Sequence, residues 1–187
     1  RFEVLKREAE IACWKSVSMG GDRDSCLQTL SRQLAELDEE FGFIARCNEG
    51  GEIMSDEDIE RVGEIARRTW RRTLDDRLGV SWEEGQRKSR QAPQALPVEE
   101  PLLADKVEHL VERGEADRMP ADNPWGFRLD VPEHKYNRGE IYNLCIRRGT
   151  LTDEERYQIN DHIVQTIIML DKLPYPRHLK AVPDIAG

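Results

Sequence analysis

The chain has 187 residues, of which 35% are charged and 38% hydrophobic, with a formal net charge of −9 and a pI near 5.1. This balance argues against binding to nucleic-acid polymers or to anionic membrane surfaces, and no apolar run is long enough to span a bilayer. Strand-like alternation is nearly absent, so we expect an all-α protein built as a helical bundle. We expect a cytoplasmic location, with membrane anchoring left open for other parts of a longer protein.

The cysteines predict no metal site of their own. Cys13, Cys26, Cys47 and Cys145 show no CxxC spacing, which argues against a zinc site. We interpret them as free, reduced thiols.

Residues 1–50 are predicted to form a long antiparallel helical hairpin. Apolar residues recur in steps of three and four from Leu27 to Ile44, a heptad-like seam, and Gly20 and Gly21 supply the turn before it. Two interpretations stay open. The hairpin is either a simple packing arm or an arm that dimerises or transmits a signal, and the second makes a homodimer a candidate assembly.

Residues 51–87 are predicted to hold further helices. Ser55 is suited to cap a helix whose buried face runs from Ile59 to Leu74, and "SWEE" (residues 81–84) fits a capping box for a short helix. Four arginines on the first of these helices are predicted to form a solvated stripe: Arg67, Arg68, Arg71 and Arg72. The stripe is the one basic cluster in this acidic chain.

The composition changes at about residue 88, and residues 88–137 are predicted to be a Pro-rich, irregular linker or wrap. Pro93, Pro97, Pro101 and Pro120 interrupt any long helix. The aromatic residues near its end, Trp125, Phe127 and Tyr136, are expected to fix the segment to a core rather than to bind a ligand.

Residues 138–187 return to helical patterning. We expect a helix over about 138–147, a capping box at Thr152 and a helix over about 152–172. Its apolar face is predicted to comprise Ile159, Ile163, Ile167 and Leu170, with His162 able to turn toward the bundle interior. A last short helix is expected near His178.

This segment resembles the middle of the bacterial HD-GYP family of metal-dependent phosphohydrolases. The stretch "LCIRRGTLTDEERYQINDHIVQTIIMLDKLPYPRHLKAVPDIAG" has the family's order of a G-x-L-T-x-E-E segment, an I-x-x-H helix, a Leu-Pro element and an I-A pair. The matching residues are Gly149, Leu151, Thr152, Glu154, Glu155, Ile159, His162, Leu173, Pro174, Ile185 and Ala186. The resemblance covers residues 138–187 and implies a partial HD-type helical fold.

The same resemblance implies a chemistry. In the family the I-x-x-H histidine is a metal ligand, which makes His162 the candidate ligand here. The family's activity is hydrolysis of cyclic di-GMP, so a cyclic dinucleotide is the implied substrate, and Fe or Mn are the ions suited to such a site. Arg147 and Arg148 are weaker candidates for contacting substrate phosphates, or they are favourable charges at a helix C-terminus. Glu154 and Glu155 are weaker candidates for supporting the site.

The departures from the family are equally informative. No His-Asp dipeptide occurs in the 187 residues, the catalytic lysine that follows it is missing too, and the His-His-Glu run is not present. We therefore assign no catalytic residue within this chain. We expect the isolated chain to be inactive and to bind metal weakly or not at all, because one ligand cannot hold a hydrolytic ion.

Residues 1–137 show a weaker resemblance to a long helical insertion found in some large HD-GYP-like sensor proteins. The stretches "REAEIACW", "RTWRRTLDDRLG" and "NPWGFRLDVPEHKYNRGEIYNL" carry it. It implies that the His-Asp helices precede Arg1 in a longer parent protein. Two alternatives remain: a non-catalytic helical interaction or dimerisation module of a signalling protein, and an unrelated helical adaptor.

Overall fold

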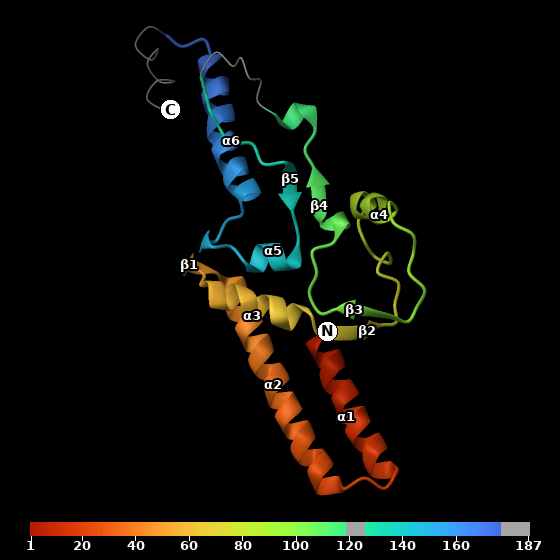
Figure 1. The fold of residues 1–187 in the computed structure, drawn as a ribbon. Coiled ribbons are helices and arrows are strands. Elements are labelled where there is room, and N and C mark those ends of the chain that lie inside the picture. Colours follow the sequence, from red (N-terminus) through yellow and green to blue (C-terminus); the bar gives the residue numbers. More distant parts are fainter. Residues whose placement is uncertain (119–125, 177–187) are drawn as a thin grey trace. The chain divides into compact units, whose positions relative to one another are not determined.

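The computed structural model describes residues 1–118 and 126–176 (Figure 1). The chain divides into two compact units. Unit 1 comprises residues 1–109 and 138–150, and unit 2 comprises residues 110–137 and 151–187. Across the described residues no helix combines the length and the apolar character needed to cross a membrane.

The described residues form six α-helices and three two-stranded antiparallel sheets, so the all-α prediction is right about the helices and missed the strands. The helices are α1 (Phe2–Ser18), α2 (Arg23–Glu49), α3 (Asp56–Ala66), α4 (Trp82–Lys88), α5 (Glu140–Leu144) and α6 (Asp153–Asp171). The strands are β1 (Gly51–Ile53), β2 (Thr69–Arg72), β3 (Val98–Pro101), β4 (Leu110–Glu112), β5 (His134–Asn137) and β6 (Arg148–Gly149). Two short 3₁₀ turns, η1 (Val107–His109) and η2 (Glu115–Asp117), complete the described elements.

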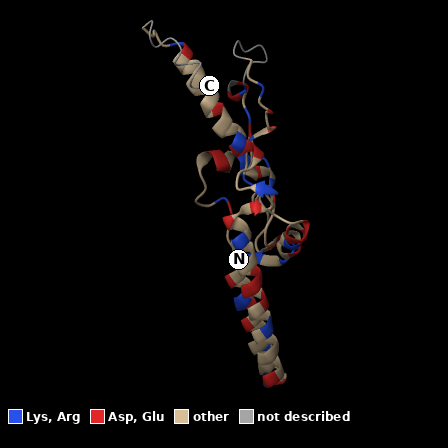
Figure 2. Ribbon diagram, turned by 90° about the vertical axis from the view of Figure 1, so that its left-hand side faces the viewer, with Lys and Arg blue, Asp and Glu red and all other residues tan. Residues whose placement is uncertain are grey.

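Helices α1 and α2 form the expected antiparallel hairpin in unit 1 (Figure 1). Asp22 caps α2, its carboxylate accepting a hydrogen bond of 2.8 Å from the backbone N–H of Ser25. Leu30 and Leu37 of the predicted seam are buried, whereas Phe41 is 55% exposed. Basic and acidic side chains are interspersed along the hairpin (Figure 2), with acidic residues in the majority on α2.

The apolar core of unit 1 joins segments that are distant in sequence. Its buried members come from α2, α3, the segment after β3 and α5: Phe43, Val62, Ile65, Leu102 and Leu144. Nearby, β1 pairs with β6, with Gly51 opposite Gly149. In unit 1, residues of the first half of the chain therefore pack and pair with residues 144–149.

The basic cluster is not a helical stripe, which corrects the prediction. Helix α3 ends at Ala66, and the next residues form β2, which pairs with β3 from the Pro-rich segment. Because side chains alternate along a strand, Arg71 is exposed while Arg72 is buried. Arg72 pairs with Glu100, with Nη2 and Oε1 2.9 Å apart, and both side chains are 9% exposed.

The segment predicted as an irregular linker contains β3, β4 and β5. In unit 2, β4 pairs with β5, and Val111 lies opposite Tyr136. Phe127 and Tyr136 are half-buried, while Trp125 lies outside the described residues.

Helix α6 uses a different face from the one predicted. It lies beside β5 and buries Tyr157 and Val164, which are two turns apart on one side. Ile159 and Ile163 project from the opposite side and remain 49% and 52% exposed. The spacing correctly identified a row of apolar residues on one side of α6. The β4–β5 hairpin covers the opposite side, which carries Tyr157 and Val164.

Candidate functional site

The start of α6 is set by local hydrogen bonds. Gly149 has a φ of 71°, a left-handed conformation that glycine adopts readily. Thr152 Oγ1 then accepts from the N–H of Glu155 at 3.2 Å, and the Glu155 carboxylate accepts from the N–H of Thr152 at 3.0 Å. This confirms the predicted capping box and gives Glu155 a structural role. Glu154 is buried, with 6% exposure.

His162 lies in the third turn of α6 with an exposed side chain. Its backbone carbonyl accepts a hydrogen bond of 2.8 Å from the Thr166 hydroxyl. The expectation that the ring faces a bundle interior is wrong for the described residues, because Tyr157 and Val164 occupy the covered side. The role of His162 as a metal ligand stays a prediction.

Arg147 and Arg148 belong to unit 1, whereas His162 belongs to unit 2. Helix α5 ends at Leu144, so neither arginine lies in its last turn, and the helix C-terminus interpretation is wrong. The Arg147 guanidinium pairs with the Asp56 carboxylate at 2.6 Å, and Arg148 lies in β6; both are exposed. Contact of these arginines with a substrate phosphate stays a prediction.

A buried aromatic–guanidinium pair, which the sequence analysis missed, lies in unit 2. The Arg113 guanidinium stands 4.3 Å from the centroid of the Tyr157 ring and donates to three carbonyls: those of Asp117 at 3.2 Å, Pro132 at 3.1 Å and His134 at 3.0 Å. Arg113 therefore fastens the β4–β5 hairpin and packs it on α6. The sequence signal for this pair was Tyr157, which lies on the same side of the helix as Val164.

The hydroxyl of Tyr157 is buried and has no hydrogen-bond partner among the described residues. Burial raises the pKa of Tyr157, and the negative charge of Asp161, one turn further along α6, raises it further. The phenol is therefore neutral at physiological pH. It is a buried polar group on the helix side that faces β5, while His162 is exposed on the other side.

One of three comparisons with known proteins gives a match. Residues 97–187, just under half of the chain, match the model of the HD domain family. Searches of curated proteins and of solved structures gave no match. The family match supports an HD-type phosphohydrolase, and HD domains are generally metal-dependent hydrolases. It covers all of unit 2 and the last parts of unit 1.

HD domains typically bind divalent metals, which requires several ligands that converge on one point. Within residues 1–118 and 126–176, no three His, Cys, Asp or Glu side chains converge where an ion could bind. The four cysteines are free thiols. The described residues therefore do not fit a metal centre, and we derive no catalytic step through a metal. Ile185 and Ala186 of the expected motif, and the short helix expected near His178, lie outside the described residues.

Proposed function

We propose that this chain is the central part of a bacterial signalling phosphohydrolase of the HD-GYP type, which hydrolyses cyclic di-GMP when the remaining motifs are present in the same protein. The observation that carries the proposal is the agreement between the HD domain match and the ordered motif from Gly149 to His162. The motif is specific because both its order and its spacing match the family resemblance.

The local structure of the motif supports this proposal. The capping box begins α6 at a defined residue, which sets the rotation of the helix and hence the direction of His162. His162 shares the exposed side of α6 with Ile159 and Ile163. An exposed imidazole beside apolar residues is suited to receive further helices that bring the missing ligands, with Fe or Mn as the proposed ions.

The isolated chain is proposed to be inactive. A hydrolytic site needs several imidazole and carboxylate ligands to activate water and to offset phosphate charge. The sequence has no His-Asp dipeptide and no His-His-Glu run. One histidine cannot hold the ion by itself.

Cyclic di-GMP turnover with Mn²⁺ or Fe²⁺ tests the proposal in a longer protein that contains this chain and both missing motifs. His162→Ala is expected to abolish turnover and to lower bound metal, measured by mass spectrometry of the metal content. Asn160→Ala is the matched control, because Asn160 is exposed on the same helix. Absence of turnover in the unmodified, metal-loaded protein would reject the phosphodiesterase proposal.

A non-catalytic interaction module is the second candidate, and the hairpin favours it. Ile11 and Trp14 are 52% and 49% exposed on α1, and the Arg23 guanidinium of α2 stands 5.9 Å from the centroid of the Trp14 ring. We propose this face as a contact between two copies of the chain. Sedimentation equilibrium should give a dimer that Ile11→Glu dissociates, whereas a monomer at high concentration would reject it.

A further inference from the structure

Two of the four free cysteines lie near the tip of the α1–α2 hairpin. Cys13 belongs to α1 and is buried, with 8% exposure, whereas Cys26 lies in the first turn of α2 and is half-buried. Both belong to unit 1. Neither the HD domain resemblance nor the proposed hydrolysis assigns these thiols a role.

Contacts along the hairpin show which turns of the two helices lie opposite each other. Far from the tip, the rings of Phe2 and Phe41 stand 5.5 Å apart. Close to the tip, the Arg23 guanidinium stands 5.9 Å from the centroid of the Trp14 ring. The two cysteines fall between these contacts, one residue before Trp14 and three residues after Arg23. They therefore lie on facing turns of the two antiparallel helices.

The side chains of these two cysteines interact directly. Burial raises the pKa of the Cys13 thiol, and the charge of Cys26 and its contact with Cys13 raise the pKa further. Cys13 is therefore the neutral, covered thiol of the pair, and Cys26 is the one that solvent reaches. Rotation about the two Cα–Cβ bonds is the movement that brings such touching thiols to disulfide geometry.

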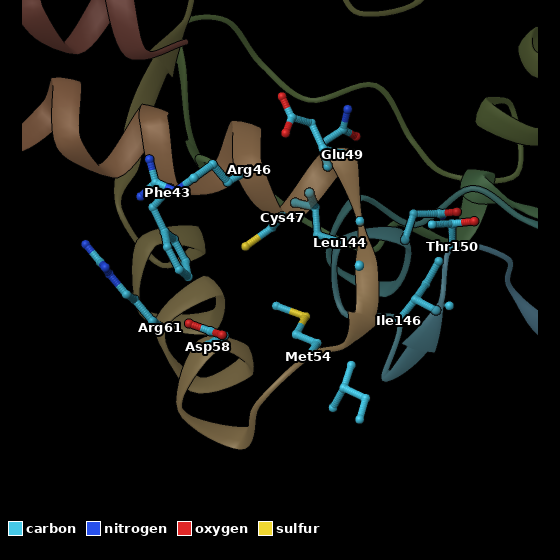
Figure 3. A pocket seen from close by; sticks show the side chains of 16 residues that line it. Phe43, Arg46, Cys47, Glu49, Met54, Asp58, Arg61, Leu144, Ile146 and Thr150 are labelled. Atoms are coloured by element: carbon cyan, nitrogen blue, oxygen red, sulfur yellow. The ribbon is translucent and has the colours of Figure 1, made fainter.

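The other two cysteines give a comparison within the same unit. Cys47 lines a cavity of about 440 Å³ at the end of α2, and its sulfur is directed toward that space (Figure 3). Cys145 follows α5 and packs against the core. Burial raises the pKa of Cys145 and the charge of Cys47 raises it further, but no hydrogen bond joins these two thiols. Unit 1 thus holds one cysteine pair in contact and a second pair that is only nearby.

We propose that Cys13 and Cys26 form a reversible disulfide across the hairpin by exchange with a low-molecular-weight disulfide of the glutathione type. Cys26, the more exposed residue, attacks as the thiolate, forms a mixed disulfide and releases one small thiolate. Cys13 then loses its proton, attacks the Cys26 sulfur and releases the second small thiolate. The two protein thiols are oxidised, the small disulfide is reduced to two thiols, and the released thiolates take up the two protons.

This bridge would close a loop that contains the whole tip of the hairpin. Within the loop, the N–H of Gly21 donates to the carbonyl of Ser16 at 2.9 Å. Because a disulfide restricts the opened chain, hydrogen exchange at Gly21 is expected to slow by about tenfold or more in the oxidised protein. Amides of α3, outside the loop, are expected to exchange at unchanged rates. The inference is independent of the proposed phosphohydrolase function, because it uses only residues of unit 1.

Incubation of the full chain with oxidised and reduced glutathione tests the inference. The reaction is stopped with acid, the remaining thiols are alkylated in denaturant, and peptides are identified by mass spectrometry. The expected result is a bridge between Cys13 and Cys26, with Cys47 and Cys145 alkylated and all four thiols restored by dithiothreitol. The inference is overturned if the four thiols stay free, if other cysteines or two chains are joined instead, or if the urea-unfolded chain forms the same bridge as readily.

Two single variants separate the steps. Cys13→Ser is expected to stop at the mixed disulfide, so that Cys26 carries one glutathione. Cys145→Ser is the matched control and is expected to form the bridge as the unmodified chain does. Circular dichroism checks that both variants keep their helices. A Cys13→Ser protein without glutathione on Cys26, or a Cys145→Ser protein without the bridge, would contradict the proposed exchange.

Discussion

Unit 1 and unit 2 differ in what their buried side chains are. Unit 1 has an apolar core in which Val62 and Leu102 are fully buried, together with the buried Arg72–Glu100 pair. The described part of unit 2 is organised around Arg113 and Tyr157, while Ile159 and Ile163 stay exposed. Among the described residues, the unit that lies wholly within the HD domain match has only two buried apolar side chains, Tyr157 and Val164. In this chain, the segment that matches the HD domain model is therefore not the unit with the larger apolar core.

The largest expected effect is a cavity in the core of unit 1. Leu102→Ala should lower the free energy of unfolding by about 3 kcal/mol, because a fully buried leucine leaves a void when truncated. Leu173→Ala, which removes the same atoms from a side chain that is 53% exposed, should change it by less than about 0.5 kcal/mol. Urea denaturation followed by circular dichroism measures both. Equal losses would contradict the contrast between the units.

The buried ion pair should give the next largest effect. Arg72→Met leaves the buried Glu100 carboxylate with Lys106, whose Nζ lies 3.6 Å away, and should lower the free energy of unfolding by about 2–3 kcal/mol. Arg71→Met on the same strand is the exposed control and should be nearly neutral. Urea titration, which does not screen charges, is the suitable measurement. A small loss for Arg72→Met would mean that the remaining charges compensate fully.

A smaller effect is expected at the start of α6 in unit 2. Thr152→Ala should destabilise the helix by about 1 kcal/mol, because the N–H of Glu155 loses its acceptor. Thr152→Ser keeps the hydroxyl and should retain most of the stability. Hydrogen exchange of the amide of Glu155, followed by NMR, reports on this bond directly. Faster exchange in both variants would show that the methyl group, rather than the cap, stabilises the turn.

The smallest effect is a pH dependence at Glu140 of unit 1. Burial would raise the pKa of this carboxyl, but hydrogen bonds from the Arg1 side chain and from the N–H of Ala104 outweigh it and hold the pKa below its ordinary 4.5. The ionised form therefore stabilises the fold above pH 4.5, and this contribution is lost as the pH falls through the lowered value.

The size of that contribution should be less than about 1 kcal/mol, because the carboxylate is 30% exposed. Urea midpoints measured from pH 7 to pH 3 should fall less steeply for Glu140→Gln than for the unmodified chain. Identical slopes for the two proteins would assign the acid sensitivity to other carboxylates.

Features encoded within a few residues were predicted well. The predicted helix starts at Ser55, Ser81 and Thr152 each agree with a cap in the structure, because a cap depends on residues three positions apart. The seam of α2 was readable for the same reason, since helical periodicity is local.

Features that depend on distant partners were not predictable in the same way. Strand β2 forms because the segment around Glu100 pairs with it, and no residue close to Arg72 in the sequence indicates that partner. The buried side of α6 was misassigned because two sides of the helix carry apolar residues, and only the β4–β5 hairpin decides which one is covered. His162 was found through a family motif, and the directions of its neighbours could not be read from spacing alone.

The β1–β6 ribbon has a kinetic consequence. It joins Gly51 to Gly149, about a hundred residues apart, so its formation must close a long loop, whereas the α1–α2 hairpin needs only a four-residue turn. During synthesis the hairpin can form as soon as residue 49 has left the ribosome. The cavity bordered by Gly51 and Thr150 can be completed only about a hundred residues later, roughly 5–20 s at ordinary translation speeds. This part of unit 1 is therefore the last to assemble, and the nascent chain must keep Phe43 from other partners until then.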